Sequence, residues 1–477
     1  MLRIALLLLA PLVLALPQSS RGAVYTVGPG GTHATIQGAI NAALAAGGSH
    51  EVRVRAGMYL ERINVGTAIG GKALTLSGGW NAAFNARTFD PAVTVLDAQG
   101  LDRVVQLLPE GGDLVIDGFT FMNGSTDNFG GGVRLQRIST GSFTLANCRV
   151  LGSTAANGGG IYVDATGTAS VLLLDNHVEG NTSRNLSVTP VRGGGLSVRA
   201  LGDATFTIRH NRFVGNQLVA LAGEGSGIGS GVYVKLQENP YVDFSDNVIE
   251  ANVSTGTGTV LGDGGSLQLL NFCHVGFTCT GMTLEARRNQ WLDNQDQTLG
   301  GLARNIDILM DIDYATAHLS DSVVAGGAGT GIAFHSAVGT LTLTNMTVVE
   351  HAGPALHDRT GGSLVDAPVW NSLFWQNASE PPLAGVRNNL VGVDPLFVDA
   401  PGRNYALFGN SPAIDAGDAS PPPGLGPQDV YGGGRIFGPT VDVGAAEWRR
   451  ARRCGLGFEA ALALLPLGAW RARRRSR

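Results

Sequence analysis

A glycine-rich motif followed by alternating apolar residues recurs five times in the middle of the chain. The copies are GGGVRL at Gly130, GGGIYV at Gly158, GGGLSV at Gly193, GSGVYV at Gly229 and GGSLQL at Gly264. An asparagine follows the first glycine of a copy after 17 residues at Asn147, and after 18 residues at Asn176, Asn211 and Asn247. Self-similarity at a nearly fixed period is the sequence signature of repeat architectures. A fold for this chain must therefore place the copies in equivalent positions.

Each repeat has the pattern of a set of short strands with one apolar face. It holds two or three stretches of period-two alternation separated by Gly, Asn or Asp, and almost no helical periodicity. A single unit of this kind cannot bury its apolar face, whereas stacked units form a continuous core and pair their backbone edges. Glycine supplies the backbone freedom that a tight corner needs. We therefore expect an all-β fold, a parallel β-helix solenoid with the glycine triplets at its corners.

Asparagines at one position of each coil are expected to form a ladder. An amide at the same corner of successive coils can hydrogen-bond to its copies above and below, as in stacked strands. In other coils the same repeated position is occupied by Asp117 and Asp321. The expected ladder consists of Asn147, Asn176, Asn211, Asn247, Asn289, Asn345 and Asn371.

The N-terminal part of the chain predicts export and a cap for the solenoid. Residues 1–23 combine Arg3, a short apolar run and small polar residues, which is typical of a secretory signal peptide. In the segment TIQGAINAALAAGG, Thr35 is a suitable N-cap, and Ile36, Ile40 and Leu44 share one helical face. Open solenoid ends need covering. We expect a short amphipathic helix over the first coil.

These features divide the chain into five parts. They are the signal peptide at 1–23, the cap and first coils at 24–115, the β-helix repeats at 116–390, a C-terminal β-helix segment at 391–448 and a tail at 449–477. The net charge is −5, and basic residues cluster only at the extreme C-terminus. This distribution argues against a nucleic-acid partner.

Four cysteines are expected to have different roles. Cys273 and Cys279 lie in FCHVGFTC, and in an oxidising compartment we expect a disulfide between them. A metal site using His274 is the alternative, but two Cys and one His lack a fourth ligand. Cys148 alternates into a coil and is expected to be buried and free.

Carboxylates in NIDILMDIDY form the best candidate catalytic cluster. Asp307, Asp311 and Asp313 are separated by even numbers of residues, so they lie on one face of a strand. Arg304 precedes them. Residues two apart on a strand are separated by roughly 6.5–7 Å, a spacing compatible with an inverting carboxylate pair or with a Ca²⁺ site. The alternative is that alternating Asp forms the solvated face of a half-buried strand.

The tail RRARRCGLGFEAALALLPLGAWRARRRSR has three parts. A basic stretch is followed by Cys454-Gly, an apolar run and a terminal Arg cluster. The apolar run is shorter than the ~20 residues that span a bilayer. This layout resembles the C-terminal sorting signals of bacterial surface proteins, and the resemblance implies a processed anchor with Cys454 as the processing or lipid-attachment point. A buried or unpaired cysteine in a tail helix is the alternative.

Several segments resemble known families of bacterial surface proteins. VGPGGTHATIQGAINAAL, VRVRAGMYLERINV and LTLSGGWNAAF resemble the start of right-handed parallel β-helix proteins of the pectate-lyase-like superfamily. GGGI and FVGN resemble the repeats of polymorphic outer-membrane proteins. DPLFVD, YALFGNSPAIDAGD and VDVGAAEW resemble the choice-of-anchor Q domain, and the tail resembles C-terminal sorting signals that a membrane protease removes.

The resemblances imply a right-handed β-helix attached to the outside of a bacterial cell, and a sorting protease as a partner. Known enzymes of the β-helix class act on acidic polysaccharides, so a polysaccharide lyase or glycoside hydrolase is one expectation. No complete catalytic constellation is found in this sequence, however. Our main expectation is a non-catalytic module that binds glycan or another envelope component. We expect no cofactor; Ca²⁺ is the alternative. An adhesin or passive spacer is a further alternative.

Overall fold

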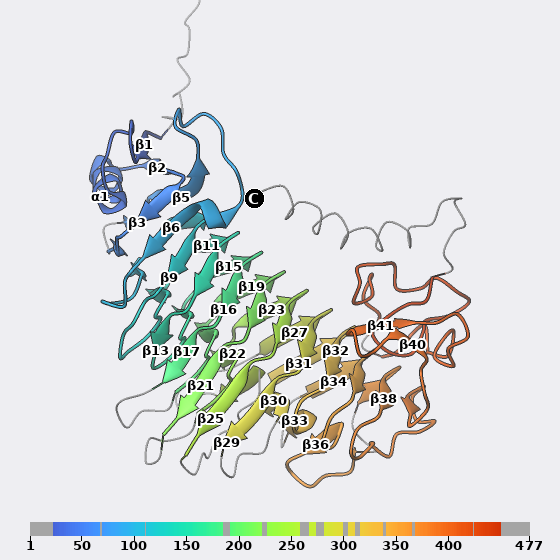
Figure 1. Ribbon diagram of the computed structural model, residues 1–477. Helices are drawn as coiled ribbons and strands as arrows, with labels where there is room; N and C mark the ends of the chain where they lie inside the picture. Colours follow the sequence, from blue (N-terminus) through green and yellow to red (C-terminus); the bar gives the residue numbers. More distant parts are fainter. Residues whose placement is uncertain are drawn as a thin grey trace, which may run out of the picture.

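The computed structural model shows a long stack of coils with a cap at one end and a loop-rich segment at the other (Figure 1). It describes residues 22–66, 69–109, 111–184, 191–221, 227–257, 267–272, 281–298, 304–310, 315–336, 340–364, 368–422 and 424–449. Within these ranges the strands of successive coils pair in parallel along three long sheets. The protein is an all-β, right-handed parallel β-helix.

We name the sheets A to D. In the described residues, sheet A has 12 strands: β1 (Val24–Val27), β2 (Ser49–Arg55), β5 (Ala73–Trp80), β8 (Asp113–Asp117), β11 (Ser142–Ala146), β15 (Ser170–Leu174), β19 (Thr205–Arg209), β23 (Tyr241–Ser245), β27 (Met282–Arg287), β31 (Ala315–Ser320), β34 (Thr340–Thr344) and β37 (Val369–Trp370). Sheet B follows it around each coil and, over the same ranges, also has 12 strands: β3 (Gly57–Tyr59), β6 (Thr94–Asp97), β9 (Thr120–Met122), β12 (Arg149–Leu151), β16 (His177–Glu179), β20 (Arg212–Val214), β24 (Val248–Glu250), β28 (Gln290–Leu292), β32 (Val323–Ala325), β35 (Thr347–Val349), β38 (Leu373–Trp375) and β39 (Leu390–Val391).

Sheet C forms the third long face, with ten strands among the described residues: β4 (Ile63–Val65), β7 (Val105–Leu107), β10 (Val133–Ile138), β14 (Ile161–Ala165), β18 (Leu196–Gly202), β22 (Val232–Glu238), β26 (Leu267–Phe272), β30 (Arg304–Met310), β33 (Thr330–Ser336) and β36 (Leu356–Asp358). Sheet D is shorter and consists, in the same ranges, of β13 (Thr154–Ala155), β17 (Thr182–Arg184), β21 (Gln217–Ala220), β25 (Val253–Gly256) and β29 (Gln295–Thr298).

The core is built from apolar residues that occupy the same position in successive coils. Val133, Ile161, Leu196 and Val232 are paired in register along sheet C, and each is at most 1% exposed. Aromatic side chains stack in the same way elsewhere, because identical positions are one strand spacing apart. The ring of Phe244 stacks between those of Phe213 and Trp291.

The expected capping helix is present as α1 (Ile36–Ala46). The Thr35 side chain accepts a hydrogen bond from Gly38 N, and Gly47 ends the helix with a φ of 73°. The helix buries the apolar face that contains Ile36 and Ile40. The Glu61 carboxylate accepts from the first backbone amides of the helix, where negative charge is favourable.

The glycine triplets form a tight corner directly before sheet C. Gly158 has a φ of 63°, and a Cβ there would lie 2.3 Å from the carbonyl oxygen of Ile161. Gly130, Gly193 and Gly229 also have positive φ. Both the left-handed backbone and the close approach require glycine at this position.

The asparagine ladder exists, but part of it was assigned to the wrong residues. Asn176, Asn211 and Asn247 stack, and each donates from Nδ2 to Oδ1 of the next, at 3.0–3.1 Å, ending on Asn289. The expected members Asn147, Asn345 and Asn371 lie one position earlier, with φ of 50–52°. From that position Asn147 and Asn345 still hydrogen-bond along the stack, each donating from Nδ2 to an aspartate Oδ1, of Asp117 at 2.9 Å and of Asp321 at 3.0 Å. In their coils the ladder position belongs to Cys148, Met346 and Ser372.

A second ladder, which the sequence analysis missed, runs five residues further along each coil. Asn181, Asn216, Asn252 and Asn294 stack with Nδ2 to Oδ1 distances of 2.9–3.0 Å. These asparagines are at most 4% exposed.

Cys148 is buried and free, as expected, and burial raises the pKa of its thiol to about 12.

The segment after β39 does not continue the coils. It contains an antiparallel pair, β40 (Phe397–Asp399) and β41 (Asn404–Leu407), and lies beside the last coils (Figure 1, orange to red). Its Tyr405 and Val443 pack against Val349 and Leu373 of sheet B. This segment therefore covers the flank of the β-helix near its C-terminal end.

Candidate functional site

Asp307 lies inside the protein in an ion cluster. It is 0% exposed, and Arg304 Nη1 and Arg359 Nη1 lie 3.2 and 3.3 Å from its Oδ2. Burial lowers the pKa of Arg304, and the neighbouring Asp307 carboxylate opposes that shift. This carboxylate neutralises the buried Arg304 and the partly exposed Arg359, and it is itself covered, so it is not open to a substrate. Asp311 and Asp313 lie outside the described residues, as do Cys273, Cys279 and Cys454.

Acidic side chains that could suggest a Ca²⁺ loop are occupied by backbone amides. Asp418 Oδ1 accepts from Ser420 N at 2.8 Å, and Asp415 Oδ1 accepts from Thr440 N at 3.3 Å. Across the described ranges, no group of three or more His, Cys, Asp or Glu side chains is placed so that it could hold a metal ion.

Cationic side chains gather on the outer face of sheet C. Arg134, Arg199 and Lys235 come from β10, β18 and β22, and Arg192 lies directly before the third glycine triplet. We call these four residues the cationic face. Since β10, β14, β18 and β22 are neighbours, the face spans three strand spacings, roughly 14 Å at about 4.8 Å each.

The arrangement follows directly from strand alternation. Val133, Leu135 and their equivalents point into the core, so Arg134 and the residues paired with it point outward. Asp164, Arg199 and Lys235 occupy one outward position in three successive coils. The alternation after each glycine triplet therefore predicts this face. This face was not expected from the sequence, because the outward residues that were taken as candidates were carboxylates.

Aromatic rings position two of the arginines. The Arg134 guanidinium lies 5.4 Å from the ring centroid of Phe129, and that of Arg192 lies 5.6 Å from the ring of Tyr233. Contacts of this kind hold a cation over a ring face without neutralising its charge. The tyrosine is itself only 3% exposed, so its ring supports the arginine from below.

Counted over the described residues, the balance of charge on this face is positive. The Asp164 carboxylate lies 3.6 Å from Arg199 Nη1. The pKa of Lys235 is lowered to about 8, first by burial and then by repulsion from Arg199 and Arg192. The part of this shift that comes from Arg199 and Arg192 reflects repulsion between like charges on the face. An anion bound on this face would relieve that repulsion.

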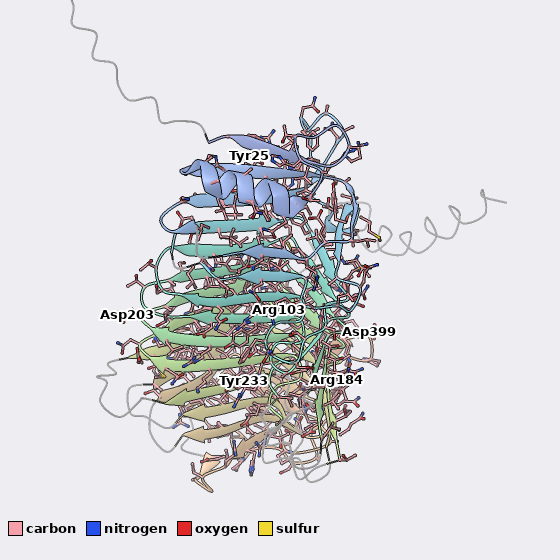
Figure 2. The ribbon with its side chains drawn as sticks, turned by 90° about the vertical axis from the view of Figure 1, so that its left-hand side faces the viewer. Tyr25, Arg103, Arg184, Asp203, Tyr233 and Asp399 are labelled. Carbon is pink, nitrogen blue, oxygen red and sulfur yellow. The ribbon has the colours of Figure 1, made fainter. Side chains whose placement is uncertain are left out.

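A pocket nearer the cap extends the same surface. Arg62, Asn64, Asp102, Arg103 and Gln106 line a cavity of about 280 Å³, which we call the arginine pocket. Asn64, Gln106 and Arg134 occupy one outward position in successive coils. Figure 2 looks onto sheet C, with Arg103 and Tyr233 labelled on the same side of the molecule.

Arg103 is a buried cation with unused hydrogen-bonding capacity. It is 8% exposed; Nη1 donates to Gln106 Oε1 at 2.8 Å and Nη2 to Thr126 Oγ1 at 3.1 Å. Its Nε has no hydrogen-bond partner in the described part of the chain, and Asp102 Oδ1 lies 3.8 Å from it. Burial lowers the pKa of this guanidinium. The arginine pocket therefore favours an anionic ligand group.

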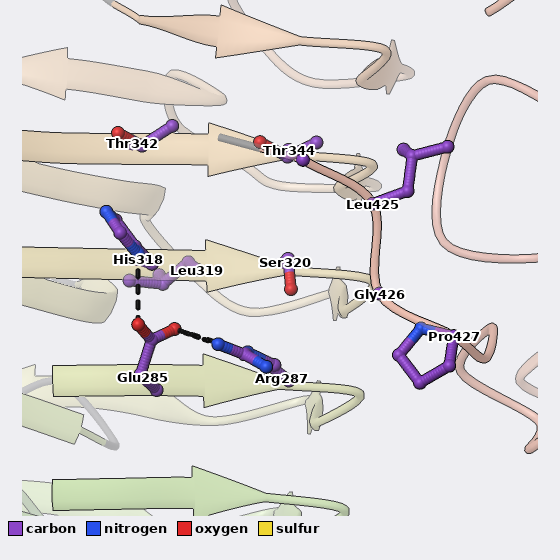
Figure 3. Close-up of a pocket in the computed structure, with 11 residues that line it drawn as sticks. Glu285, Arg287, His318, Leu319, Ser320, Thr342, Thr344, Leu425, Gly426 and Pro427 are labelled. Atoms are coloured by element: carbon purple, nitrogen blue, oxygen red, sulfur yellow. Dashed lines mark hydrogen bonds and ion pairs between the residues drawn. The ribbon is translucent and has the colours of Figure 1, made fainter. Parts of the chain in front are cut away.

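A second pocket lies on a different face, where the C-terminal segment meets sheet A (Figure 3). We call it the junction pocket. It is lined by side chains of β27, β31 and β34 and by the segment 424–427. Glu285 Oε1 lies 3.0 Å from His318 Nδ1, and Glu285 Oε2 accepts from Arg287 Nη2 at 2.6 Å. Burial alone would raise the pKa of Glu285, but these hydrogen bonds and charges lower it.

A scan against protein-family models finds no match, and neither does a search of curated proteins. In the described part of the chain, no helix combines the length and apolar character needed to cross a membrane.

Proposed function

We propose that this protein is an exported, surface-attached module that binds an anionic glycan along sheet C without cleaving it. The observation that carries the proposal is the convergence of Arg134, Arg192, Arg199 and Lys235 from neighbouring coils onto one face. The whole chain has a net charge of −5, so this positive region runs against the overall sign. Guanidinium groups bind carboxylate groups through paired, charge-assisted hydrogen bonds.

The form of the face suits a linear polymer. Equivalent side chains repeat at the strand spacing along a straight axis, and the arginine pocket adds another basic position towards the cap. A chain with regularly spaced negative charges can contact several coils at once, and each additional contact adds to the overall affinity. A single small anion would use only part of this surface.

The place of action is a further part of the proposal. The N-terminal 23 residues predict secretion, and the tail with Cys454 predicts processing by a sorting protease and attachment to the bacterial surface. The resemblance to pectate-lyase-like proteins and to the choice-of-anchor Q domain supports the same location. A polysaccharide lyase or glycoside hydrolase remains the alternative, because it would bind the same class of polymer.

Binding to a panel of polysaccharides tests the proposal. We expect polygalacturonate or alginate to retard the protein in affinity gels, and neutral dextran not to. Raising the ionic strength should weaken the retardation, because screening reduces attraction between exposed charges. The double variant Arg199→Gln/Lys235→Gln should lose about tenfold or more in affinity, since it removes two charge-assisted contacts.

The matched control is Arg149→Gln/Arg212→Gln, which makes the same charge change on sheet B. Equal losses in both double variants would show that binding reflects net charge alone and would contradict the proposed site. Release of reducing sugars or unsaturated uronides from any bound polymer would overturn the non-catalytic assignment and favour the enzyme.

A further inference from the structure

The junction pocket exists because two separate parts of the chain meet. Outward side chains of sheet A form its floor, and Leu425, Gly426 and Pro427 of the C-terminal segment form one wall (Figure 3). Its volume of about 120 Å³ has room for several water molecules. It lies on a different sheet from the cationic face, so its ligand must be considered separately.

The Glu285 carboxylate is a fixed acceptor on this floor. Its two oxygens are each held by a neighbour, His318 on the next strand and Arg287 on its own. The Glu285 side chain is 12% exposed, and its pKa is lowered, so it stays ionised. Arg287 donates to Oε2 from both Nε and Nη2, whereas Oε1 has His318 as its one neighbour. Because a carboxylate oxygen has two lone pairs, Oε1 can still accept a hydrogen bond from a ligand.

Hydroxyl groups surround this acceptor. Ser320, Thr342 and Thr344 line the pocket from the two following strands. Thr344 is 2% exposed, and its Oγ1 has no hydrogen-bond partner within the described residues. A buried hydroxyl without a partner is costly, and a ligand that hydrogen-bonds to it would remove that cost. This hydroxyl is the observation that points to a ligand rather than to a purely structural cluster.

We propose that the junction pocket binds a neutral, hydroxylated sugar ring. Sugar hydroxyls can donate to the Glu285 carboxylate and both donate to and accept from Thr344 Oγ1. The apolar surfaces of Leu425 and Pro427 can contact the C–H groups of the ring. An anionic ligand is disfavoured for two reasons. Arg287 and His318 are already engaged by the Glu285 carboxylate, and the negative charge of Glu285 would repel an anion.

Saturation-transfer NMR and calorimetry with the methyl pyranosides of glucose, galactose and mannose test this inference. We expect at least one of them to bind, and methyl galacturonoside, which carries a free carboxylate, to bind more weakly. The ring could belong to a single free sugar or to one unit of a polymer. A neutral oligosaccharide of the same sugar distinguishes these two sources. Equal affinity per molecule indicates that the pocket takes a single unit, and higher affinity indicates a site along a polymer. Absence of binding by all three neutral pyranosides and the oligosaccharide would overturn the inference.

The variant Thr344→Val separates binding from stability. It removes the unpartnered hydroxyl and keeps the shape, so affinity should fall about tenfold while the Tm stays equal or rises. Thr207→Val, on the outward side of β19 and outside the pocket, should leave the affinity unchanged. Unchanged affinity in Thr344→Val would contradict the inference. The double variant Arg199→Gln/Lys235→Gln should bind the neutral pyranoside normally, so this inference and the proposed function can fail separately.

Discussion

At the scale of the residue, two adjacent corner positions place different demands on a side chain. The first has a left-handed backbone and holds Asp175, His210 or Asp246, with φ of 56–59°. Asn and Asp tolerate this conformation better than other non-glycine residues. The second holds Asn176 or Asn211, whose amide hydrogen-bonds along the stack. Asparagine suits both positions, but for different physical reasons.

Replacing Asn211 by Leu should destabilise the protein by about 1–3 kcal/mol. Asn211 Oδ1 accepts from both the backbone N and the side chain of Asn176, and Asn211 Nδ2 donates to Asn247 Oδ1. Leucine would leave these buried groups without partners. Urea unfolding measures the change. Gln217→Leu, at an exposed position in the same coil, should change stability by no more than about 0.5 kcal/mol. An equal effect of both substitutions would contradict the role of the ladder.

The double use of asparagine explains what the sequence could predict at this scale. Spacing identified Asn176, Asn211 and Asn247 correctly, because these coils have equal lengths between glycine and ladder. Asn147 follows its glycine by 17 residues and not 18, which is the one-residue difference that places it in the left-handed position. The ladder position in coils that use Cys148 or Ser372 carries no asparagine to reveal it.

At the scale of the element, ion pairs fasten the C-terminal segment to the β-helix. Arg435 is 3% exposed and lies 3.3 Å from Asp321 of the left-handed corner and 3.7 Å from Glu447. Arg403 pairs with Asp293 and, at 2.6 Å, with Glu350 at another corner. The docked segment also forms one wall of the junction pocket, so its attachment controls that site.

Glu447, which lies beside Arg435 within the C-terminal segment, makes the stability of the protein sensitive to pH. Burial raises its pKa from 4.5 to about 7, against the attraction of Arg435. Between these values the folded protein holds a proton that the unfolded chain has released, so the free energy of unfolding should fall as pH rises from 4.5 to about 7. The loss should be about 1–3 kcal/mol. Burial raises the pKa of Asp321 and Asp442 in the same direction.

Urea unfolding at the two ends of this pH window checks the prediction. The natural protein should be less stable at the upper end, and Glu447→Gln, which cannot ionise, should show a smaller difference. Glu285 does not interfere in this window. Its pKa is lowered, so the stability that it contributes is lost only when the pH falls below the usual pKa of a glutamate. Greater stability of the natural protein at the upper end would contradict the assignment.

Elements were predicted from sequence with unequal success. The helix α1 and the glycine corners were expected where they occur, because local capping and backbone demands specify them. The segment that contains Arg435 was expected to continue the β-helix, since its turns resemble those of a final coil. Its lateral docking depends on pairs such as Arg435 with Asp321, which are more than a hundred residues apart and leave no local pattern.

At the scale of the whole molecule, the distribution of charge supports the proposed function. The protein is acidic overall, but sheet C presents Arg134, Arg192, Arg199 and Lys235 together. The three long faces of the solenoid lie on different sides, so an anionic polymer on one face leaves the junction pocket on another accessible. In the proposed function, this cationic face is the surface that contacts the glycan.

Amine labelling tests this claim most directly, because the chain has only two lysines, Lys72 and Lys235. Lys72 Nζ donates to Leu44 O near the cap, away from the cationic face, and serves as an internal control. With its pKa lowered to about 8, Lys235 has a substantial uncharged, reactive fraction near that pH. Mass spectrometry should show that polygalacturonate or alginate protects Lys235 and not Lys72, and that dextran protects neither. Equal labelling of Lys235 with and without a retained anionic polymer would contradict the account.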